Sequence, residues 1–303
     1  PMLSALSTYR TQTRPSPYHG TVGWITNWPE RNEWRAESFV LYRQGAVEAL
    51  AQHGYRVEDF WLQEPGLTTR RAAQILQSRG IRGLLIAPLP VHFGHLSLPW
   101  EKFASITFGH TMTRPALHLV TTYHYQNMQM SLRHLHHLGY RRPGFVTWDA
   151  LSKRVRHFWT AAYRMRPFAT KREKDVPILQ LDTDRGPDAF SPANRKVFLK
   201  WFETHRPDAI LTVDRHIIDW LIGAGYRVPE DVAYVSPSLQ PSNVEFSGVL
   251  EPSLEIGRTA GDFLVGMLNR GEYGIPKVPR RIFLEGQWQA GTTARRRSAA
   301  AAD

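Results

Sequence analysis

The sequence predicts an α/β protein with two similar, doubly wound parallel sheets. Three observations lead to this prediction. Short strand-like runs alternate with amphipathic stretches from residue 21 onward, and amphipathic stretches end at Gly54, Gly80 and Gly139. Some of the strand-like runs are apolar throughout, such as GLLIA at residues 83–87. Alternation of this kind is typical of βαβ units, and continuously apolar strands are typical of parallel sheets covered on both faces.

The elements of the first half follow from hydrophobic pattern and capping residues. Thr68 and Thr69 can cap a helix, and glycine supplies the left-handed residue that commonly follows a helix. Strands are expected at residues 21–26, 55–62, 83–87, 103–109 and 117–122, and helices at about residues 38–53, 70–79 and 125–138.

The second half continues the same rhythm. Strands are expected at residues 143–147, 177–181, 208–213 and 231–236, with helical segments between them. No sequence repeat of fixed period is visible, so any duplication lies in the architecture rather than in the residues.

Composition limits the class of protein. A chain of 303 residues that is 42% hydrophobic can bury a core for two domains. It lacks an apolar run of the roughly 18 residues needed to cross a bilayer, and it does not start with the pattern of a secretory signal. The absence of cysteine excludes disulfides, thiol catalysis and cysteine-ligated metals, and it agrees with a reducing compartment, so we expect a cytoplasmic protein.

The net charge of +11 allows two interpretations. A positive field attracts nucleic acid or another polyanion, whereas charge of this size also keeps a protein in solution. The sequence contains no nucleophile elbow, no Walker P-loop and no GxGxxG dinucleotide fingerprint, so we expect neither catalysis nor a cofactor.

Several motifs resemble, in the right order, those of the lactose/galactose-repressor (LacI/GalR) family of transcriptional regulators. They begin with GAVEALAQHGYRV at residues 45–57 and SLRHLHHLGYRRPGFVT at 131–147. RVRHFWTAA, PDAILTVD and GYRVPEDVAYVS follow at residues 154–162, 207–214 and 225–236. The last is LEPSLEIGRTAGDFLVGMLNRG at 250–271. The resemblance covers nearly the whole chain, and its most specific string is VPEDV.

The resemblance implies a type I periplasmic-binding-protein-like fold, in which two subdomains face a cleft and are joined by three crossovers that act as hinges. The crossovers are expected near Thr122, Glu251 and Glu285. Four parts follow: a hinge helix and linker (1–17), an N-subdomain (18–122 with 252–284), a C-subdomain (123–251 with 285–295) and a disordered tail (296–303).

The first residues, PMLSAL, resemble the end of the family's hinge segment. In that segment a leucine wedges into the minor groove of operator DNA, and Leu6 occupies the matching position. The family's helix-turn-helix would lie upstream and is absent from this sequence.

Two residues match positions that hold ligands in the family. Arg154 matches an arginine that binds sugar hydroxyls or anions, and its planar fork suits bidentate recognition. The alternative is a surface arginine in a basic run. Asp214 follows a buried strand, where its carboxylate could accept ligand hydroxyls or could cap the next helix.

Aromatic residues supply further candidates. The loop at residues 27–38 is long and rich in tryptophan and polar groups, as a sugar-stacking lid would be. Asn27, Trp28 and Trp34 from this loop, and Trp148 from the end of a strand, could bind a saccharide, because aromatic faces pack against pyranose rings. Core packing or a dimer contact is the alternative.

Three departures from the family pattern predict an unusual effector. Ser238 replaces an aspartate that usually binds sugar hydroxyls, Glu251 replaces a glutamine before Pro252, and Thr122 with Tyr123 replaces a common Asp-Asn pair. Ser238 and Glu251 remain candidate ligand-binding residues at these altered positions.

Of the histidines at 134, 136 and 137, His134 and His137 are spaced i, i+3 for a shared helix face, but no carboxylate or cysteine completes a metal site. Interaction with the helix dipole is the simpler interpretation, and no metal is expected. The sequence therefore predicts the effector-binding and dimerisation region of a repressor that senses a small molecule, most simply a saccharide, and that acts as a homodimer on operator DNA. The alternative is a sugar-binding protein of a transporter.

Overall fold

The computed structural model describes residues 18–165, 176–182 and 191–297, and the chain divides into two compact units. The first unit contains Pro1–Thr122 and Pro252–Leu284, and the second contains Tyr123–Glu251 and Glu285–Asp303. The chain therefore passes from one unit to the other three times. The expected hinge helix and linker, including Leu6, lies outside the described residues.

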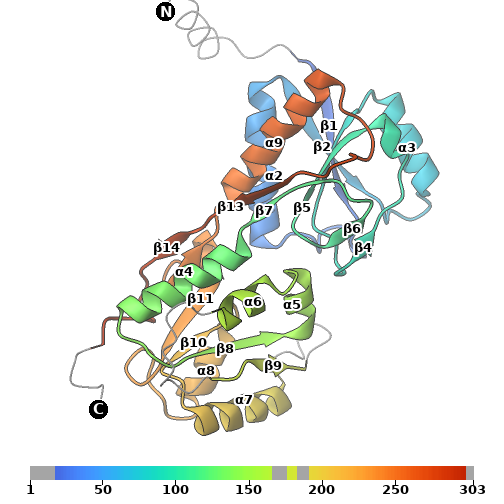
Figure 1. Ribbon diagram of the computed structural model, residues 1–303. Helices are drawn as coiled ribbons and strands as arrows, with labels where there is room; N and C mark the ends of the chain where they lie inside the picture. Colours follow the sequence, from blue (N-terminus) through green and yellow to red (C-terminus); the bar gives the residue numbers. More distant parts are fainter. Residues whose placement is uncertain (1–17, 166–175, 183–190, 298–303) are drawn as a thin grey trace, which may run out of the picture. The chain divides into compact units, whose positions relative to one another are not determined.

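The first unit is built on a parallel sheet (Figure 1). Its strands, in spatial order, are β13 (Arg281–Leu284), β7 (His118–Thr122), β5 (Ala104–Phe108), β3 (Gly83–Ile86), β1 (Gly20–Thr26) and β2 (Tyr55–Trp61). All neighbouring pairs run parallel. Two short strands, β4 (Gly94–His95) and β6 (Met112–Arg114), pair with each other outside this sheet.

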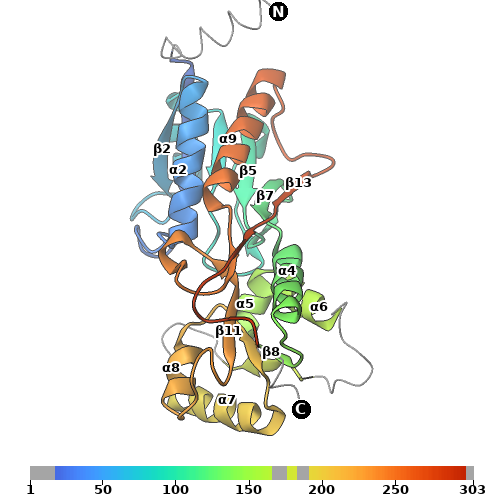
Figure 2. The same ribbon diagram turned by 90° about the vertical axis from the view of Figure 1, so that its left-hand side faces the viewer.

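Helices cover both faces of this sheet. Strand residues alternate between two hydrophobic clusters, because successive side chains on a strand point to opposite faces. Val22 and Trp24 pack with α2 (Glu37–Gln52) and α9 (Ser253–Arg270), whereas Ile25 packs with α3 (Thr69–Ser78). Figure 2 shows α2 and α9 side by side.

The second unit has a sheet of the same design. Its strands, in spatial order, are β14 (Gln287–Gln289), β12 (Gly248–Leu250), β11 (Ala233–Leu239), β10 (Ala209–Leu211), β8 (Pro143–Trp148) and β9 (Leu179–Leu181). β14 is antiparallel to β12, and the other pairs are parallel.

Helices again cover both faces. α4 (His124–His137) and α6 (Phe158–Arg164) pack with Phe145, whereas α7 (Pro192–His205) and α8 (His216–Ile222) pack with Val146. The short elements α5 (Asp149–Arg154) and η3 (Pro241–Asn243) follow β8 and β11, and η1 (Trp100–Lys102) precedes β5 in the first unit.

Both sheets follow one connection pattern. In each unit the first strand lies between the second and the third, so that the chain winds outward in both directions from it. This creates a topological switch point between β1 and β3 in the first unit, and another between β8 and β10 in the second. The predicted fold class, with two similar, doubly wound parallel sheets, is confirmed.

Arg297 lies within the segment expected to be a disordered tail from residue 296, but it belongs to the folded second unit. Its amide donates to the carbonyl of Leu138 at 2.8 Å, and its guanidinium pairs with Asp208 at 2.9 Å. The expected tail from residue 298 onward lies outside the described residues.

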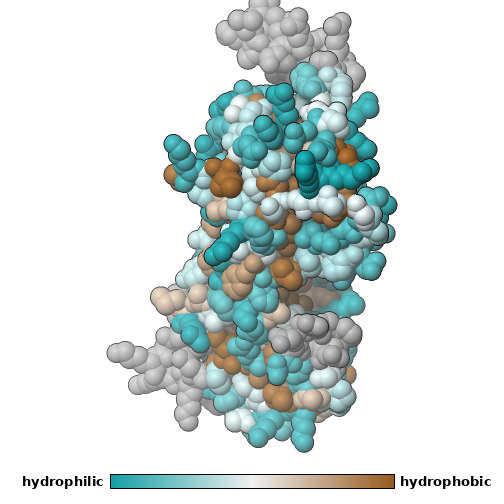
Figure 3. All heavy atoms as spheres, turned by 90° about the vertical axis from the view of Figure 1, so that its right-hand side faces the viewer, coloured by the Kyte–Doolittle hydropathy of each residue, from teal (hydrophilic) through white to brown (hydrophobic). Residues whose placement is uncertain are grey.

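Among the described helices, none is both long enough and apolar enough to cross a membrane. On the face drawn in Figure 3, hydrophilic side chains cover most of the surface and apolar groups interrupt them in patches.

Candidate functional site

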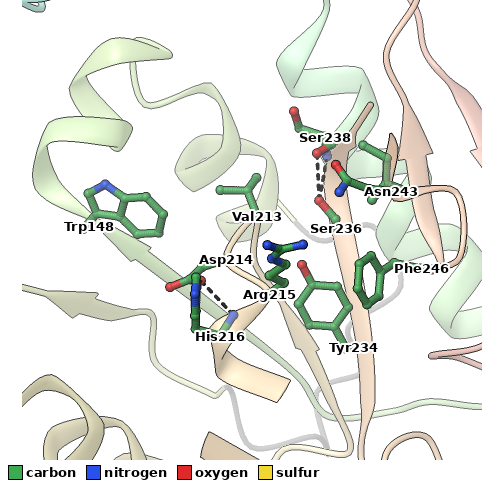
Figure 4. A pocket seen from close by; sticks show the side chains of 11 residues that line it. Trp148, Val213, Asp214, Arg215, His216, Tyr234, Ser236, Ser238, Asn243 and Phe246 are labelled. Atoms are coloured by element: carbon green, nitrogen blue, oxygen red, sulfur yellow. Dashed lines mark hydrogen bonds and ion pairs between the residues drawn. The ribbon is translucent and has the colours of Figure 1, made fainter. Parts of the chain in front are cut away.

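A pocket of about 390 Å³ opens in the second unit, at the switch point between β8 and β10 (Figure 4). In doubly wound sheets, ligands bind outside the carboxyl ends of the strands at this point. The pocket volume falls in the usual range for small-molecule sites, roughly 300–1,000 Å³. Its lining residues are Trp148, Val213, Asp214, Arg215, His216, Tyr234, Ser236, Ser238, Leu239, Asn243 and Phe246.

Asp214 is the buried carboxylate of the pocket, with 6% of its surface exposed. Its Oδ1 accepts the backbone N–H of His216 at 2.9 Å and lies 3.0 Å from the Nδ1 of the same residue. Burial raises the pKa of Asp214, and the hydrogen bonds from His216 partly oppose this shift. No described residue donates a hydrogen bond to Oδ2, so this oxygen can accept one from a ligand.

Two serines of β11 present oxygen atoms to the pocket. The Ser238 hydroxyl donates to Oε1 of Glu251 at 2.7 Å, and the Ser236 hydroxyl donates to the Ser238 carbonyl at 2.9 Å. The Ser236 oxygen also accepts the backbone N–H of Ser238 at 3.2 Å, so it is bonded within the protein. The Ser238 hydroxyl uses its proton on Glu251, and its oxygen is left as an acceptor toward the pocket.

Glu251 fixes Ser238 from outside the pocket lining. It is 7% exposed and accepts a second bond from the Gln240 side chain at 3.3 Å. The Nδ1 of His124 lies 3.9 Å from its Oε1. The carboxylate therefore holds the Ser238 hydroxyl in one orientation.

Aromatic rings form the apolar part of the lining. Tyr234 and Phe246 pack edge to face with their centroids 5.6 Å apart, and Trp148 is half-buried at the end of β8. Burial raises the pKa of Tyr234; the charge of Asp214 adds to this shift and that of Arg215 opposes it. The lining thus combines apolar ring surface with fixed polar groups, as small-molecule sites do.

Comparison with known protein families identifies the family of this chain. The model of the periplasmic binding protein-like domain matches residues 132–293, which is more than half of the chain. The chain belongs to the periplasmic binding protein-like domain family. No curated protein matches the sequence.

Solved structures with the same fold include transcriptional regulators. One is a LacI family regulator from Enterococcus faecium with bound ribose, at 15% identity and a TM-score of 0.61, with 92% of this chain and 100% of that chain covered. Another is a LacI family regulator from Weissella paramesenteroides with bound glucose. It matches at 15% identity and a TM-score of 0.61, with 91% of this chain and 98% of that chain covered. A putative ribose operon repressor from Burkholderia thailandensis matches at 21% identity and a TM-score of 0.59, with 89% of this chain and 98% of that chain covered.

This periplasmic binding protein-like chain brings three of the predicted ligand residues together. Trp148, Asp214 and Ser238 line the pocket, although they come from three different strand ends. Glu251 contacts Ser238 but does not line the pocket. Arg154 ends α5 in the same unit, half-buried and outside the pocket lining, so its role in ligand binding stays a prediction.

The remaining candidates lie in the first unit, at its own switch point. Trp28 donates its indole N–H to the Pro88 carbonyl at 2.8 Å, which links the ends of β1 and β3. Asn27 accepts a bond from Gln63 at 2.8 Å. Both stay candidates.

Trp34 is 6% exposed and packs against Trp24 with ring centroids 5.7 Å apart. It belongs to the core cluster of the first unit, which agrees with the alternative of core packing, and its role in ligand binding stays a prediction.

Sequence reasoning missed eight of the eleven lining residues, among them Arg215, Tyr234, Asn243 and Phe246. Arg215 follows Asp214 directly after a buried strand, and that position was the one signal that could have indicated it. Tyr234, Asn243 and Phe246 enter the pocket through tertiary structure.

The histidine cluster on α4 has a packing role. His134 stacks on Trp288 at 4.2 Å with the rings 2° from parallel, and burial lowers its pKa. In the part of the chain that the structure describes, no group of three metal-ligating side chains comes together.

Proposed function

We propose that this chain senses a polyhydroxylated small molecule, a saccharide, as the effector-binding and dimerisation region of a DNA-binding transcriptional regulator. The observation that carries the proposal is the pocket at the switch point of the second unit. It presents fixed acceptor oxygens beside aromatic surface. Sugar hydroxyls donate to such oxygens, and the apolar face of a pyranose packs on such rings.

The sugar-bound regulators of the same fold support the proposal. In the proposed mechanism, a saccharide binds one conformational state of the chain more tightly than another and thereby shifts its population. In a homodimer joined to DNA-binding domains, such a shift changes operator affinity. Catalysis has no part in this mechanism.

Thermal unfolding with a panel of mono- and disaccharides tests the proposed ligand class. A ligand that binds only the native state raises the melting temperature in proportion to its saturation. Asp214→Asn removes an acceptor charge but can still accept the His216 N–H, so we expect normal folding and about 10- to 100-fold weaker binding.

Glu203→Gln is the control, because Glu203 is exposed on α7 and does not line the pocket. Arg154→Ala tests the residue matched by motif. If no saccharide shifts the melting temperature, or if Asp214→Asn binds as wild type does, the proposed site is wrong.

A DNA-binding assay distinguishes a transcriptional regulator from the sugar-binding protein of a transporter. Band shifts of operator-containing fragments with the protein joined to its DNA-binding domain should change when the saccharide is added. Sedimentation should show a dimer. A monomer that binds sugar with no effect on DNA would support the transporter alternative.

A further inference from the structure

The polar side chains of the second unit's pocket fall into two groups. One group is already bonded within the protein: Asp214 to His216, Ser236 to Ser238, and Ser238 to Glu251. Of these groups, Asp214 through Oδ2 and Ser238 through its hydroxyl oxygen offer acceptors to a ligand. This part of the pocket therefore selects ligand groups that donate hydrogen bonds.

The other group has no partner. Of the polar side chains that line the pocket, Arg215 and Asn243 make no hydrogen bond or ion pair with any described residue. Arg215 supplies five N–H donors and a permanent charge, and Asn243 can supply two more donors. Although Arg215 follows Asp214 in sequence, it forms no ion pair with it, and Figure 4 shows its guanidinium turned away from the Asp214–His216 pair.

Arg215 lines the pocket but is exposed, so a ligand that fills the pocket removes part of its water. Desolvating a charged group is costly unless a partner of opposite charge replaces the water. A neutral sugar would leave the guanidinium uncompensated, and an amine would repel it. A carboxylate or phosphate would compensate the charge and could form the paired N–H···O bonds that the guanidinium fork favours.

We infer that the preferred ligand is an acidic saccharide, a polyol that carries a carboxylate or phosphate. Its anionic group binds Arg215 and Asn243, and its hydroxyls donate to Asp214 and Ser238. The Asp214 carboxylate bonds to His216 and makes no ion pair with Arg215, so the hydroxyls and the anionic group of the ligand use different side chains of the pocket. The inference rests on the proposed function and names the ligand class of that same pocket.

Calorimetry with matched ligand pairs tests the inference. The pairs are glucose with glucuronate, galactose with galacturonate, sorbitol with gluconate, and glucose with glucose 6-phosphate. In each pair that binds, we expect the acidic member to bind about 10- to 100-fold more tightly, the range for a hydrogen-bonded charged pair. The preference should fall sharply near 1 M NaCl, where the Debye length is about 3 Å.

Variants at Arg215 test whether this residue causes the preference for acidic ligands. Arg215→Gln should remove it while leaving the affinity for the neutral member within about threefold, since the neutral sugar gains nothing from the charge. Arg215→Lys keeps the charge without the fork and should retain part of the preference. Lys196→Gln, on the exposed face of α7, removes the same charge away from the pocket and should leave the preference intact.

The outcomes separate the two proposals. Neutral members that bind as tightly as acidic ones, or a preference that survives in Arg215→Gln, would overturn the acidic ligand and leave the saccharide sensor standing. If neither acidic nor neutral members bind, both proposals fail. The glucuronate and glucose 6-phosphate arms show whether the anionic group is a carboxylate or a phosphate.

Discussion

Ser238 and Arg215 illustrate what a sequence states about a residue and what it omits. The sequence marked Ser238 and Glu251 as unusual against the family pattern, but it could not show that they bond to each other across 13 residues. Their bond decides that the Ser238 oxygen acts as an acceptor. The sequence did not predict Arg215 as a pocket residue, because its residue type does not reveal whether a partner neutralises its charge.

The VPEDV string has a structural explanation at the same scale. Asp231 accepts the backbone N–H, Nε and Nη2 of Arg227 at 2.7–2.9 Å, which closes the turn between α8 and β11. These hydrogen bonds lower the pKa of Asp231 from 3.8 to about 2. A motif that resembles a family marker thus lies in a turn that the Arg227–Asp231 hydrogen bonds close.

Asp231→Asn should make the stability of the protein less dependent on pH in acid. The native state lowers the pKa of Asp231, so the carboxylate contributes stability above the unfolded value, and this contribution is lost as the pH falls from about 4 to about 2. Urea unfolding should show the variant to be less stable than wild type at neutral pH, with the difference shrinking toward pH 2. Glu203→Gln, an exposed change on α7, should show no such convergence; a constant difference for Asp231→Asn would contradict the role of its charge.

At the scale of elements, glycine made the helix ends predictable. Helices expected at residues 38–53 and 125–138 occur at Glu37–Gln52 and His124–His137, and Gly54 and Gly139 after them have φ values of 77° and 95°. Thr68 caps α3 by accepting the N–H of Arg71. These signals are local, so the sequence carries them completely.

The strands β12, β13 and β14 were not predicted, and of these β13 and β14 lie at the edges of their sheets. They contain three or four residues each, and β13 and β14 are partly exposed. Each is defined by the strand it pairs with, such as β7 for β13. A short, half-exposed strand carries too little periodic pattern to be recognised without that partner.

The contact between α2 and α9 depends on glycines that let the helix backbones approach closely. A Cβ at Gly257 would overlap the Tyr42 carbonyl, whereas a Cβ at Gly266 would meet only the flexible end of Arg270. Gly257→Ala should therefore lower the free energy of unfolding by about 1–3 kcal/mol. Gly266→Ala, on the same helix, should raise it by about 0.5–1 kcal/mol through helix propensity. Chemical denaturation measures both, and effects of equal sign would contradict the close-packing argument.

At the scale of the whole molecule, the order of strands and helices could be predicted because strand-like and helical patterns alternate along the sequence. That order placed Trp148, Asp214 and Ser238 at strand ends. Both sheets share a connection pattern although no residue repeat links them. The switch point between β8 and β10 arises from that order, so the location of the pocket follows from topology. Which side chains fill it depends on packing that crosses the sequence, and this part required the structure.

The last described segment of the chain completes the second unit by contacts of long sequence separation. The Thr293 hydroxyl donates to the Tyr234 carbonyl at 2.8 Å and accepts the Ser247 N–H at 2.9 Å, and the residue is 8% exposed. The last described segment therefore bonds to β11, the strand that carries Tyr234 and Ser238, and forms part of the folded second unit.

Thr293→Val tests this closure with almost no change of shape. The substitution leaves the buried N–H of Ser247 without an acceptor, so unfolding should become easier by about 1–3 kcal/mol. Thr292→Val changes the neighbouring exposed threonine, whose hydroxyl donates to the Glu245 carbonyl at 3.1 Å, and should stay within about 0.5 kcal/mol of wild type. Urea titrations of both variants make the comparison. Equal effects would mean that the two hydrogen bonds of the Thr293 hydroxyl, to Tyr234 and Ser247, do not hold the end of the chain in the second unit.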